Sequence, residues 1–197
     1  MRTADPALHA QRKAQILEAA TACFITDGFH GATTAQIAKA AGISMGLLYR
    51  YYPSKDELII AAAAQDRDQY IVAIETFGNA TSLASGLTEY LRVVFDRALD
   101  LGYVRLSCEV LAEAGRNPVL RKTLAEDGAV LRKAMIAAIK TLQKRGLIAA
   151  KLVPAATADF LGILVDGTIG RIVMDTSTDR RTLLAATRDY VVTALTV

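Results

Sequence analysis

The stretch from Thr33 to Leu58 constrains the fold of this chain most strongly, because it places several helix starts around one tight turn. Thr33 and Gln36 have the spacing of a capping box, in which side chains and backbone groups at a helix start bond one another. Ser44 is a second capping residue. Gly42 stands where a short helix must end in a left-handed residue, which glycine adopts without steric cost. The pattern predicts two short helices joined by a turn at Gly42.

The side chains of this pair divide into an inner and an outer set. The inner set is apolar and recurs every three to four residues, so it should pack together: Ile37, Ala38, Ala41, Ile43, Leu48 and Tyr52. The outer set belongs to the second helix: Met45, Gly46, Leu47, Tyr49, Arg50 and Tyr51. Exposed Leu and Tyr side chains indicate a docking surface. Tyr and Arg bind phosphates, Arg also binds guanine, and Leu or Met touches a thymine methyl group. The pattern favours a helix-turn-helix whose second helix enters the DNA major groove; the alternative is a surface helix hairpin packed on another helix.

Short motifs extend through the whole stretch: Thr33-Thr34, Ile37-Ala38, Ala41-Gly42-Ile43-Ser44, Gly46, Leu48-Tyr49, Tyr52 and Lys55-x-x-Leu58. Together they resemble the N-terminal DNA-binding domain of the TetR (tetracycline repressor) family of bacterial transcription regulators. Tyr52 stands where that family usually has Phe. We expect DNA contacts from Thr33, Thr34, Ser44, Met45, Gly46, Leu47, Tyr49, Arg50, Tyr51 and Lys55. Within this set Thr33, Thr34, Tyr49, Tyr51 and Lys55 would hold phosphates, and Gly46, Leu47 and Arg50 would meet base edges.

Helical periodicity continues to the C-terminus and predicts an all-α chain of about nine helices. A first helix over about 8–27 would complete a three-helix DNA-binding domain at residues 1–53. Ser54, spaced as a capping box with Glu57, would open a long helix to about 77. Residues 54–197 are then expected to form a helical bundle for ligand binding and dimerisation.

Composition excludes several other classes. The formal net charge of +3 argues neither for nor against DNA binding. No segment has the apolar length of a membrane span, and no signal peptide is evident, which favours the cytoplasm. The cysteines, Cys23 and Cys108, are expected to be buried free thiols. The sequence contains no catalytic constellation, metal-ligand spacing or phosphate-binding glycine loop, so we expect no enzyme activity, metal or cofactor.

The segment from Pro154 onward carries three glycines inside an expected helix, at positions 162, 167 and 170. Each is unfavourable there by about 1 kcal/mol relative to Ala, and a close helix–helix approach would compensate. We therefore place a homodimer interface here, as the resemblance also implies: Phe160, Ile163, Gly167, Gly170, Leu184, Tyr190 and Val191. The alternative is that the glycines only bend one helix inside a monomer core.

The resemblance also implies a ligand cavity within the bundle. Candidate lining residues are Tyr70, Ile74, Tyr90, Phe95, Tyr103, Cys108, Glu109, Met135, Ile139 and Asp166. Their chemistry suggests a largely apolar small-molecule effector with one or two polar handles. Glu109 and Asp166 need partners if they are buried, and an internal or interface partner is favoured over a ligand. Arg171 is one candidate partner for Asp166.

These features predict a homodimeric repressor that binds a near-palindromic double-stranded operator and is released by its effector. A constitutive DNA-binding adaptor, whose bundle binds a protein instead of a small molecule, is the first alternative. An enzyme or lipid carrier that has a helix-turn-helix only by shape is the second.

Overall fold

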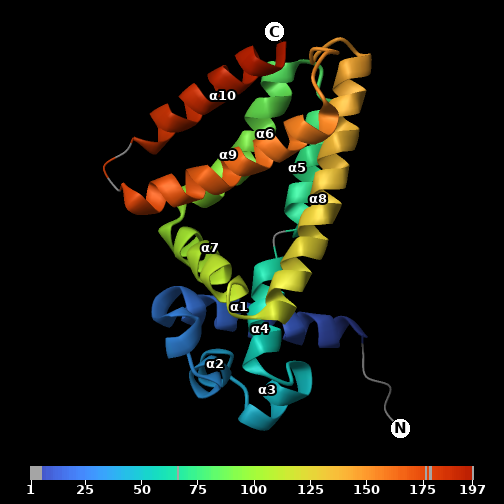
Figure 1. The fold of residues 1–197 in the computed structure, drawn as a ribbon. Helices are drawn as coiled ribbons and strands as arrows, with labels where there is room; N and C mark the ends of the chain where they lie inside the picture. The colour runs from blue at the N-terminus through green and yellow to red at the C-terminus, as the bar shows by residue number, and fades with distance from the viewer. Residues whose placement is uncertain (1–5, 66, 176, 178, 197) are drawn as a thin grey trace. The chain divides into compact units, whose positions relative to one another are not determined.

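The computed structural model describes residues 6–65, 67–175, 177 and 179–196, and these residues are predominantly helical. The helices are α1 (Pro6–Gly31), α2 (Thr34–Ala40), α3 (Met45–Tyr51), α4 (Lys55–Ala64), α5 (Arg67–Asn79), α6 (Leu83–Leu99), α7 (Leu101–Ala114), α8 (Pro118–Lys144), α9 (Pro154–Met174) and α10 (Arg180–Thr196) (Figure 1). The all-α prediction with an N-terminal helix-turn-helix is confirmed. Within the described ranges, no helix is both long and apolar enough to cross a bilayer.

The chain divides into two compact units. The first holds α1 to α4 together with residues 105–123, which are the later part of α7 and the start of α8. The second holds the remaining described residues after Gln65. α4 thus groups with the helix-turn-helix, although the sequence suggested a boundary after Pro53.

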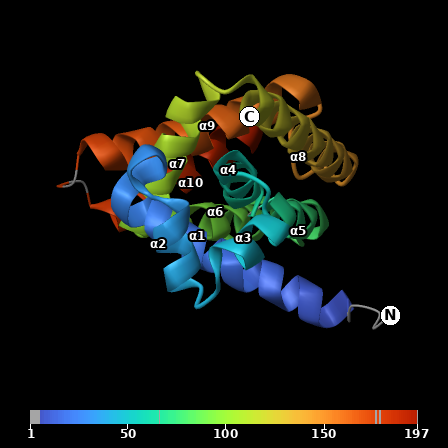
Figure 2. The ribbon, with the colours of Figure 1, turned by 90° about the horizontal axis from the view of Figure 1, so that it is seen from below.

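The first unit is built on α1, which packs against α2 and α4 (Figure 2). α1 has a break at Gly28, whose φ of 71° and ψ of 170° are not helical. The expected end of the first helix at Gly28 therefore coincides with a real interruption, after which the chain turns helical again to Gly31. Phe24 and Phe29 meet edge to face across the break, with ring centroids 4.9 Å apart.

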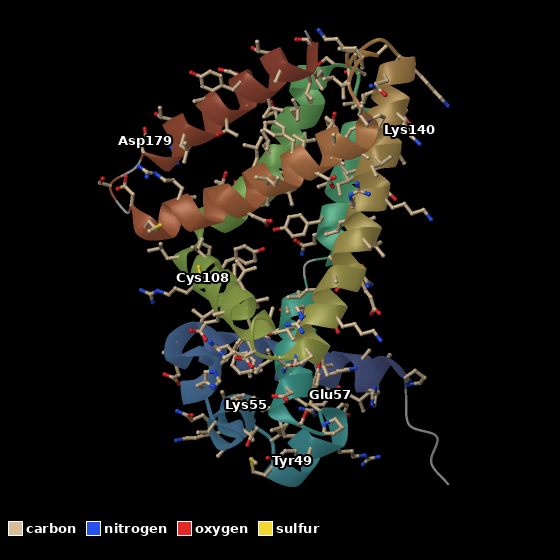
Figure 3. The ribbon with its side chains drawn as sticks, in the orientation of Figure 1. Tyr49, Lys55, Glu57, Cys108, Lys140 and Asp179 are labelled. Atoms are coloured by element: carbon tan, nitrogen blue, oxygen red, sulfur yellow. The ribbon has the colours of Figure 1, made fainter. Side chains whose placement is uncertain are left out.

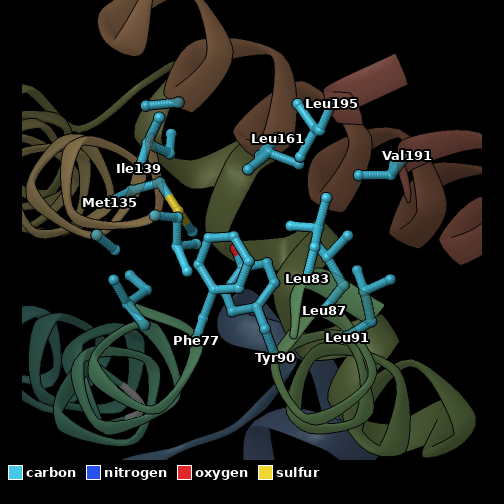
Figure 4. Close-up of a cluster of buried hydrophobic side chains, with 14 of the residues drawn as sticks. Phe77, Leu83, Leu87, Tyr90, Leu91, Met135, Ile139, Leu161, Val191 and Leu195 are labelled. Atoms are coloured by element: carbon cyan, nitrogen blue, oxygen red, sulfur yellow. The ribbon is translucent and has the colours of Figure 1, made fainter. Parts of the chain in front are cut away.

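The second unit has one large apolar core contributed by α5, α6, α8, α9 and α10 (Figure 4). Phe77, Leu87, Ile139 and Leu142 are completely enclosed in it. α5 lies against α6, and α10 also packs on α6. α5 and α8 approach closely at Gly78, where a Cβ atom would lie only 3.0 Å from the Cβ of Ala138.

Two expectations about helix boundaries need correction. We expected a single long helix from Ser54 to about residue 77. The structure has two helices instead: α4 ends at Ala64 and α5 begins at Arg67. Only half of the predicted capping box forms at Ser54: its Oγ accepts from the N–H of Glu57, but the Glu57 carboxylate does not bond the Ser54 N–H in return.

Replacing Ile139 by alanine tests the second core. We expect Ile139→Ala to lower the free energy of unfolding by about 2–5 kcal/mol, because it opens a cavity where the side chain is fully buried. The neighbouring Lys140→Ala is the matched control, since Lys140 is exposed on the same helix turn (Figure 3). Chemical denaturation of both variants measures the difference; equal stabilities would contradict the described packing.

Candidate nucleic-acid interface

The turn between α2 and α3 is closed by hydrogen bonds that the sequence predicted. The Thr33 Oγ1 accepts from the Gln36 N–H at 3.2 Å, and the Gln36 side chain accepts from the Thr33 N–H at 2.7 Å. Gly42 adopts a φ of 64°, and the N–H of Ile43 reaches back to the carbonyl of Ala38 at 3.0 Å. Ser44 Oγ then accepts from the Leu47 N–H at 3.2 Å and starts α3. The predicted capping box, turn and second cap are confirmed.

The inner set of side chains packs as expected. Ile37 and Leu48 are fully buried, and Ala38, Ala41 and Tyr52 are each 3% exposed. Ile43 is half-buried. Burial raises the pKa of the Tyr52 phenol, whose hydroxyl donates to the carbonyl of Lys13 at 3.3 Å. Tyr52, the C-cap residue of α3, is therefore tied to α1 by a hydrogen bond, while α3 itself packs on α2.

A polar contact that the sequence pattern did not reveal also braces the turn. The Nε2 of Gln15, in α1, donates to the carbonyl of Ala41 at 2.9 Å. Ala41 follows the last helical residue of α2, where carbonyl groups lose their helical partners. The one hint in the sequence is the neighbouring Ile16, an apolar residue of α1 that is buried. Its burial brings the side of α1 that carries Gln15 close to α2.

The outer face of α3 is open. Gly46, Tyr49 and Arg50 are exposed, and Met45, Leu47 and Tyr51 are half-buried. A Cβ atom at Gly46 would meet nothing within 4 Å, so the backbone is accessible here. Figure 3 shows Tyr49 on α3. Gly46 thus leaves room for a close approach by another molecule.

Three of the expected phosphate-binding side chains are already arranged by contacts within the protein. The hydroxyl groups of Thr34 and Tyr49 lie 3.2 Å apart and share a hydrogen bond. Tyr51 stacks with tilted geometry on His9, with ring centroids 4.8 Å apart. These contacts restrict the rotamers of Tyr49 and Tyr51 before any ligand arrives, which lowers the entropic cost of binding.

The cationic groups differ in how firmly they are held. Lys55 Nζ donates to the carbonyl of His30 at 3.5 Å, a long contact. Arg50 makes no hydrogen bond or ion pair with any residue in the described ranges, so its guanidinium is available to a partner. α3 therefore suits contacts to phosphates and base edges. Its backbone is accessible at Gly46, the Arg50 guanidinium is available, and the Tyr49 hydroxyl is held by that of Thr34.

Comparisons with known proteins agree with this geometry. Residues 16–62 match the family model of "Bacterial regulatory proteins, tetR family". Residues 84–196, more than half of the chain, match "BetI-type transcriptional repressor, C-terminal". The chain belongs to the TetR family. It is a transcriptional regulator of the DNA-binding, helix-turn-helix class.

Curated relatives of this TetR-family chain include two bacterial regulators. The transcriptional repressor AcnR of Corynebacterium glutamicum is 24% identical over 84% of each chain. The regulator RutR of Escherichia coli is 37% identical, over 61% of this chain and 56% of RutR. Among solved structures, GusR of Salmonella enterica matches with a TM-score of 0.80 at 25% identity and covers both chains completely.

The residues expected at a dimer interface lie on α9 and α10. Ile163 is 67%, Tyr190 77% and Phe160 45% exposed. Gly167 is exposed and Gly170 is half-buried, and a Cβ on either would meet nothing within 4 Å. Val191, by contrast, is 2% exposed and packs in the second core. The Leu184 side chain lies outside the described part of the structure.

Five of the ten residues expected to line a ligand cavity lie in the core of the second unit or, in the case of Tyr70, pack against it. Ile74, Tyr90, Met135 and Ile139 are core residues of the second unit. Cys108 and Glu109 belong to the first unit, and the Phe95 side chain lies outside the described part. Tyr103 bonds Tyr70 through their hydroxyl groups at 2.8 Å. It also borders a groove of about 470 Å³ with Gln69, Arg92, Val93, Asp96 and Asp100.

Cys23 and Cys108 are free thiols, as expected, but only partly buried.

The two acidic candidates have different environments. Glu109 Oε2 accepts from the backbone N–H of Phe29 at 3.0 Å, which is an internal partner of the kind the sequence favoured. Asp166 has no hydrogen bond or ion pair with a described residue, and Arg171 pairs with Asp175 at 3.2 Å instead. Asp166 is exposed at the surface, but its neighbours still remove part of the water around its carboxyl group, and this desolvation raises the pKa of Asp166. Burial, together with the charge of Asp166, raises the pKa of Tyr90 to about 12.

Asp166→Asn should raise the melting temperature at pH 7. Because the folded-state pKa of Asp166 is raised, the folded protein holds its proton more tightly, so the charged form opposes folding at high pH. The gain should shrink as pH falls toward the unfolded-state pKa of about 4. Thermal melts from pH 4 to 7 measure it.

Asp159→Asn on the same helix is the matched control with the opposite sign. Arg132 bonds both oxygens of Asp159, at 2.5 and 3.0 Å, and this lowers the pKa of Asp159. The Asp159 variant should therefore lose stability at pH 7, and the loss should vanish in acid. A melting temperature unchanged by Asp166→Asn at every pH would contradict the assigned desolvation.

Proposed function

We propose that this regulator is a homodimeric repressor that binds a near-palindromic operator and is released by a small, largely apolar effector. Each copy would insert α3 into the major groove. The observation that carries the proposal is the open outer face of α3, with an accessible backbone at Gly46 and an Arg50 that has no partner among the described residues.

Division of labour among the contact residues follows from their positions. Thr33, Thr34, Tyr49, Tyr51 and Lys55 would bind backbone phosphates, which supply affinity without sequence information. Gly46, Leu47 and Arg50 would meet base edges, and an Arg side chain can donate two hydrogen bonds to guanine. Ser44 and Met45 would lie at the groove entrance.

A second copy is the proposed occupant of the α9–α10 surface. Phe160, Ile163 and Tyr190 are exposed apolar or aromatic side chains. The glycines at 162, 167 and 170 have no close neighbour in the described part of the chain that would explain their cost in a helix. A partner helix lying close over them would supply that explanation, and two symmetric heads would give enough phosphate contacts for a protein of only +3 charge.

Release by an effector requires that the ligand favour one conformation of the dimer over another. A difference of about 1–3 kcal/mol in binding free energy suffices to change DNA affinity five- to 150-fold. The groove beside Tyr103, and Asp166 with no partner in the described ranges, offer polar groups to such a ligand. A protein-binding adaptor would show no thermal shift with a metabolite panel, whereas an effector-binding repressor would.

Arg50→Ala and Lys55→Ala should weaken DNA binding in different ways. Arg50→Ala should relax the preference at one base pair per half-site by about 1–3 kcal/mol, because the guanidinium no longer bonds a base. Lys55→Ala should weaken all sequences alike and reduce the slope of log affinity against log salt by about 0.9 for each phosphate that is no longer neutralised. Binding-site selection and salt titration measure both. An unchanged consensus for Arg50→Ala would show that Arg50 reads no base.

Ile163→Glu should convert the protein to a monomer at micromolar concentration, since a charge would be buried against apolar groups of the partner. Operator affinity should fall with it. Val72→Glu, which changes an α5 residue that is 61% exposed, is the control and should stay dimeric. Sedimentation velocity measures the oligomeric state, and a dimeric Ile163→Glu protein would place the interface elsewhere.

A further inference from the structure

At the break in α1, a backbone N–H is bonded by a side chain from a distant helix. Gly28 leaves the helical conformation, and the N–H that follows this break belongs to Phe29. Phe29 is only 1% exposed, and a buried N–H without a partner is costly. The N–H donates to Glu109 Oε2 at 3.0 Å, from a residue 80 positions away on α7.

The Glu109 carboxylate also packs directly against Gly28. A Cβ atom at Gly28 would lie 3.3 Å from Glu109 Oε1 and 3.4 Å from its carboxyl carbon. Gly28 has a φ of 71°, so any other residue would be strained there as well. Glu109 thus packs against a backbone segment that only glycine allows in this form.

A second carboxylate of α7 binds the next residue of the segment. Glu113 lies one helical turn after Glu109 and therefore on the same face. Its Oε2 is 3.3 Å from Nε2 of His30 and 3.2 Å from a guanidinium nitrogen of Arg116, and its side chain is only 12% exposed. Two acidic side chains of α7 therefore hold residues 28–30.

The same three-residue segment also bonds a residue expected at the DNA. The carbonyl of His30 accepts from Nζ of Lys55 at 3.5 Å. Lys55 is the first residue of α4, directly after the helix-turn-helix. All of these residues belong to the first compact unit. The path of contacts runs from Glu109 through the Gly28–His30 backbone to the Lys55 ammonium group.

We propose that Glu109 is a positioning residue for DNA binding, which holds the Gly28–His30 segment in the form that presents Lys55 to a backbone phosphate. The inference rests on the proposed phosphate contact of Lys55. Glu109 itself does not touch DNA. Glu109 lies on α7, whose first residues belong to the second unit and whose later residues belong to the first.

Three substitutions of Glu109 separate its hydrogen bond from its charge. Glu109→Gln keeps a carbonyl oxygen that can accept from the Phe29 N–H but removes the charge. Glu109→Asp keeps the charge but shortens the side chain by one methylene, so the hydrogen bond is stretched or broken. Glu109→Ala removes both. Glu75→Ala, which removes an exposed carboxylate of α5, is the control for the change in net charge.

Affinity is measured by fluorescence anisotropy on a duplex obtained by binding-site selection with the wild-type protein, and on a random duplex at low salt. Glu109→Ala should bind both duplexes about two- to tenfold more weakly, the range expected for one net hydrogen bond. Glu109→Asp should be weakened in the same direction. Glu109→Gln and Glu75→Ala should stay close to wild type.

A double-mutant cycle with Lys55→Ala distinguishes positioning from a general loss of stability. If Glu109 acts through Lys55, then Glu109→Ala combined with Lys55→Ala should bind no more weakly than Lys55→Ala alone. Glu109→Ala should also reduce the salt slope as Lys55→Ala does. Effects that multiply in the double variant, or full affinity in a folded Glu109→Ala protein, would overturn the proposal.

Each failure has its own signature. If Lys55→Ala binds as tightly as wild type, the phosphate contact in the proposed function is wrong. If Lys55→Ala is weakened but Glu109→Ala and Glu109→Asp are not, only the positioning role is wrong. Circular dichroism melts establish folding, and if Glu109→Ala does not fold, Glu109→Asp carries the same cycle; multiplied effects there would equally overturn the proposal.

Discussion

Two seven-residue helices depend on one shared apolar core. Helices this short are unstable alone in water, because nucleation costs more than their few hydrogen bonds return. α2 and α3 persist because Ile37 and Leu48 are fully buried and because α2 packs on both α1 and α3. Everything proposed for DNA binding requires this core, since it determines which side of α3 remains exposed.

That core also explains the composition of the exposed side. Once Leu48 and Tyr52 face inward, the helical period places Gly46, Tyr49 and Arg50 outward. The bond between Thr34 and Tyr49 and the stacking of Tyr51 on His9 hold two aromatic side chains in place. The surface is therefore preorganised by contacts inside the protein, and a groove of DNA would bind it with little reordering.

Local signals predicted most of the helix-turn-helix. Thr33 and Ser44 cap helices by bonding backbone groups three residues away, and Gly42 adopts a positive φ, so these features can be recognised directly in the sequence.

Contacts between residues that are distant in the chain could not be predicted in this way. Glu109 bonds a backbone N–H 80 residues away, and no periodicity indicates such a contact. The separation of α4 from α5 near Gln65 was missed because the apolar pattern continues through it. The sequence did not separate core residues from pocket walls, because an apolar or aromatic side chain at helical spacing suits both; Tyr90 and Ile139 lie in the core of the second unit.

The most direct measurement is methylation protection on the DNA upstream of the gene for this protein. Dimethyl sulfate modifies guanine N7 in the major groove and adenine N3 in the minor groove. If α3 from two symmetric copies enters the major groove, guanine N7 atoms should be protected in two half-sites related by a dyad, one helical turn or a multiple apart. Minor-groove adenines in those half-sites should react as in free DNA. Protection confined to adenine N3, or a single protected site without symmetry, would contradict the account.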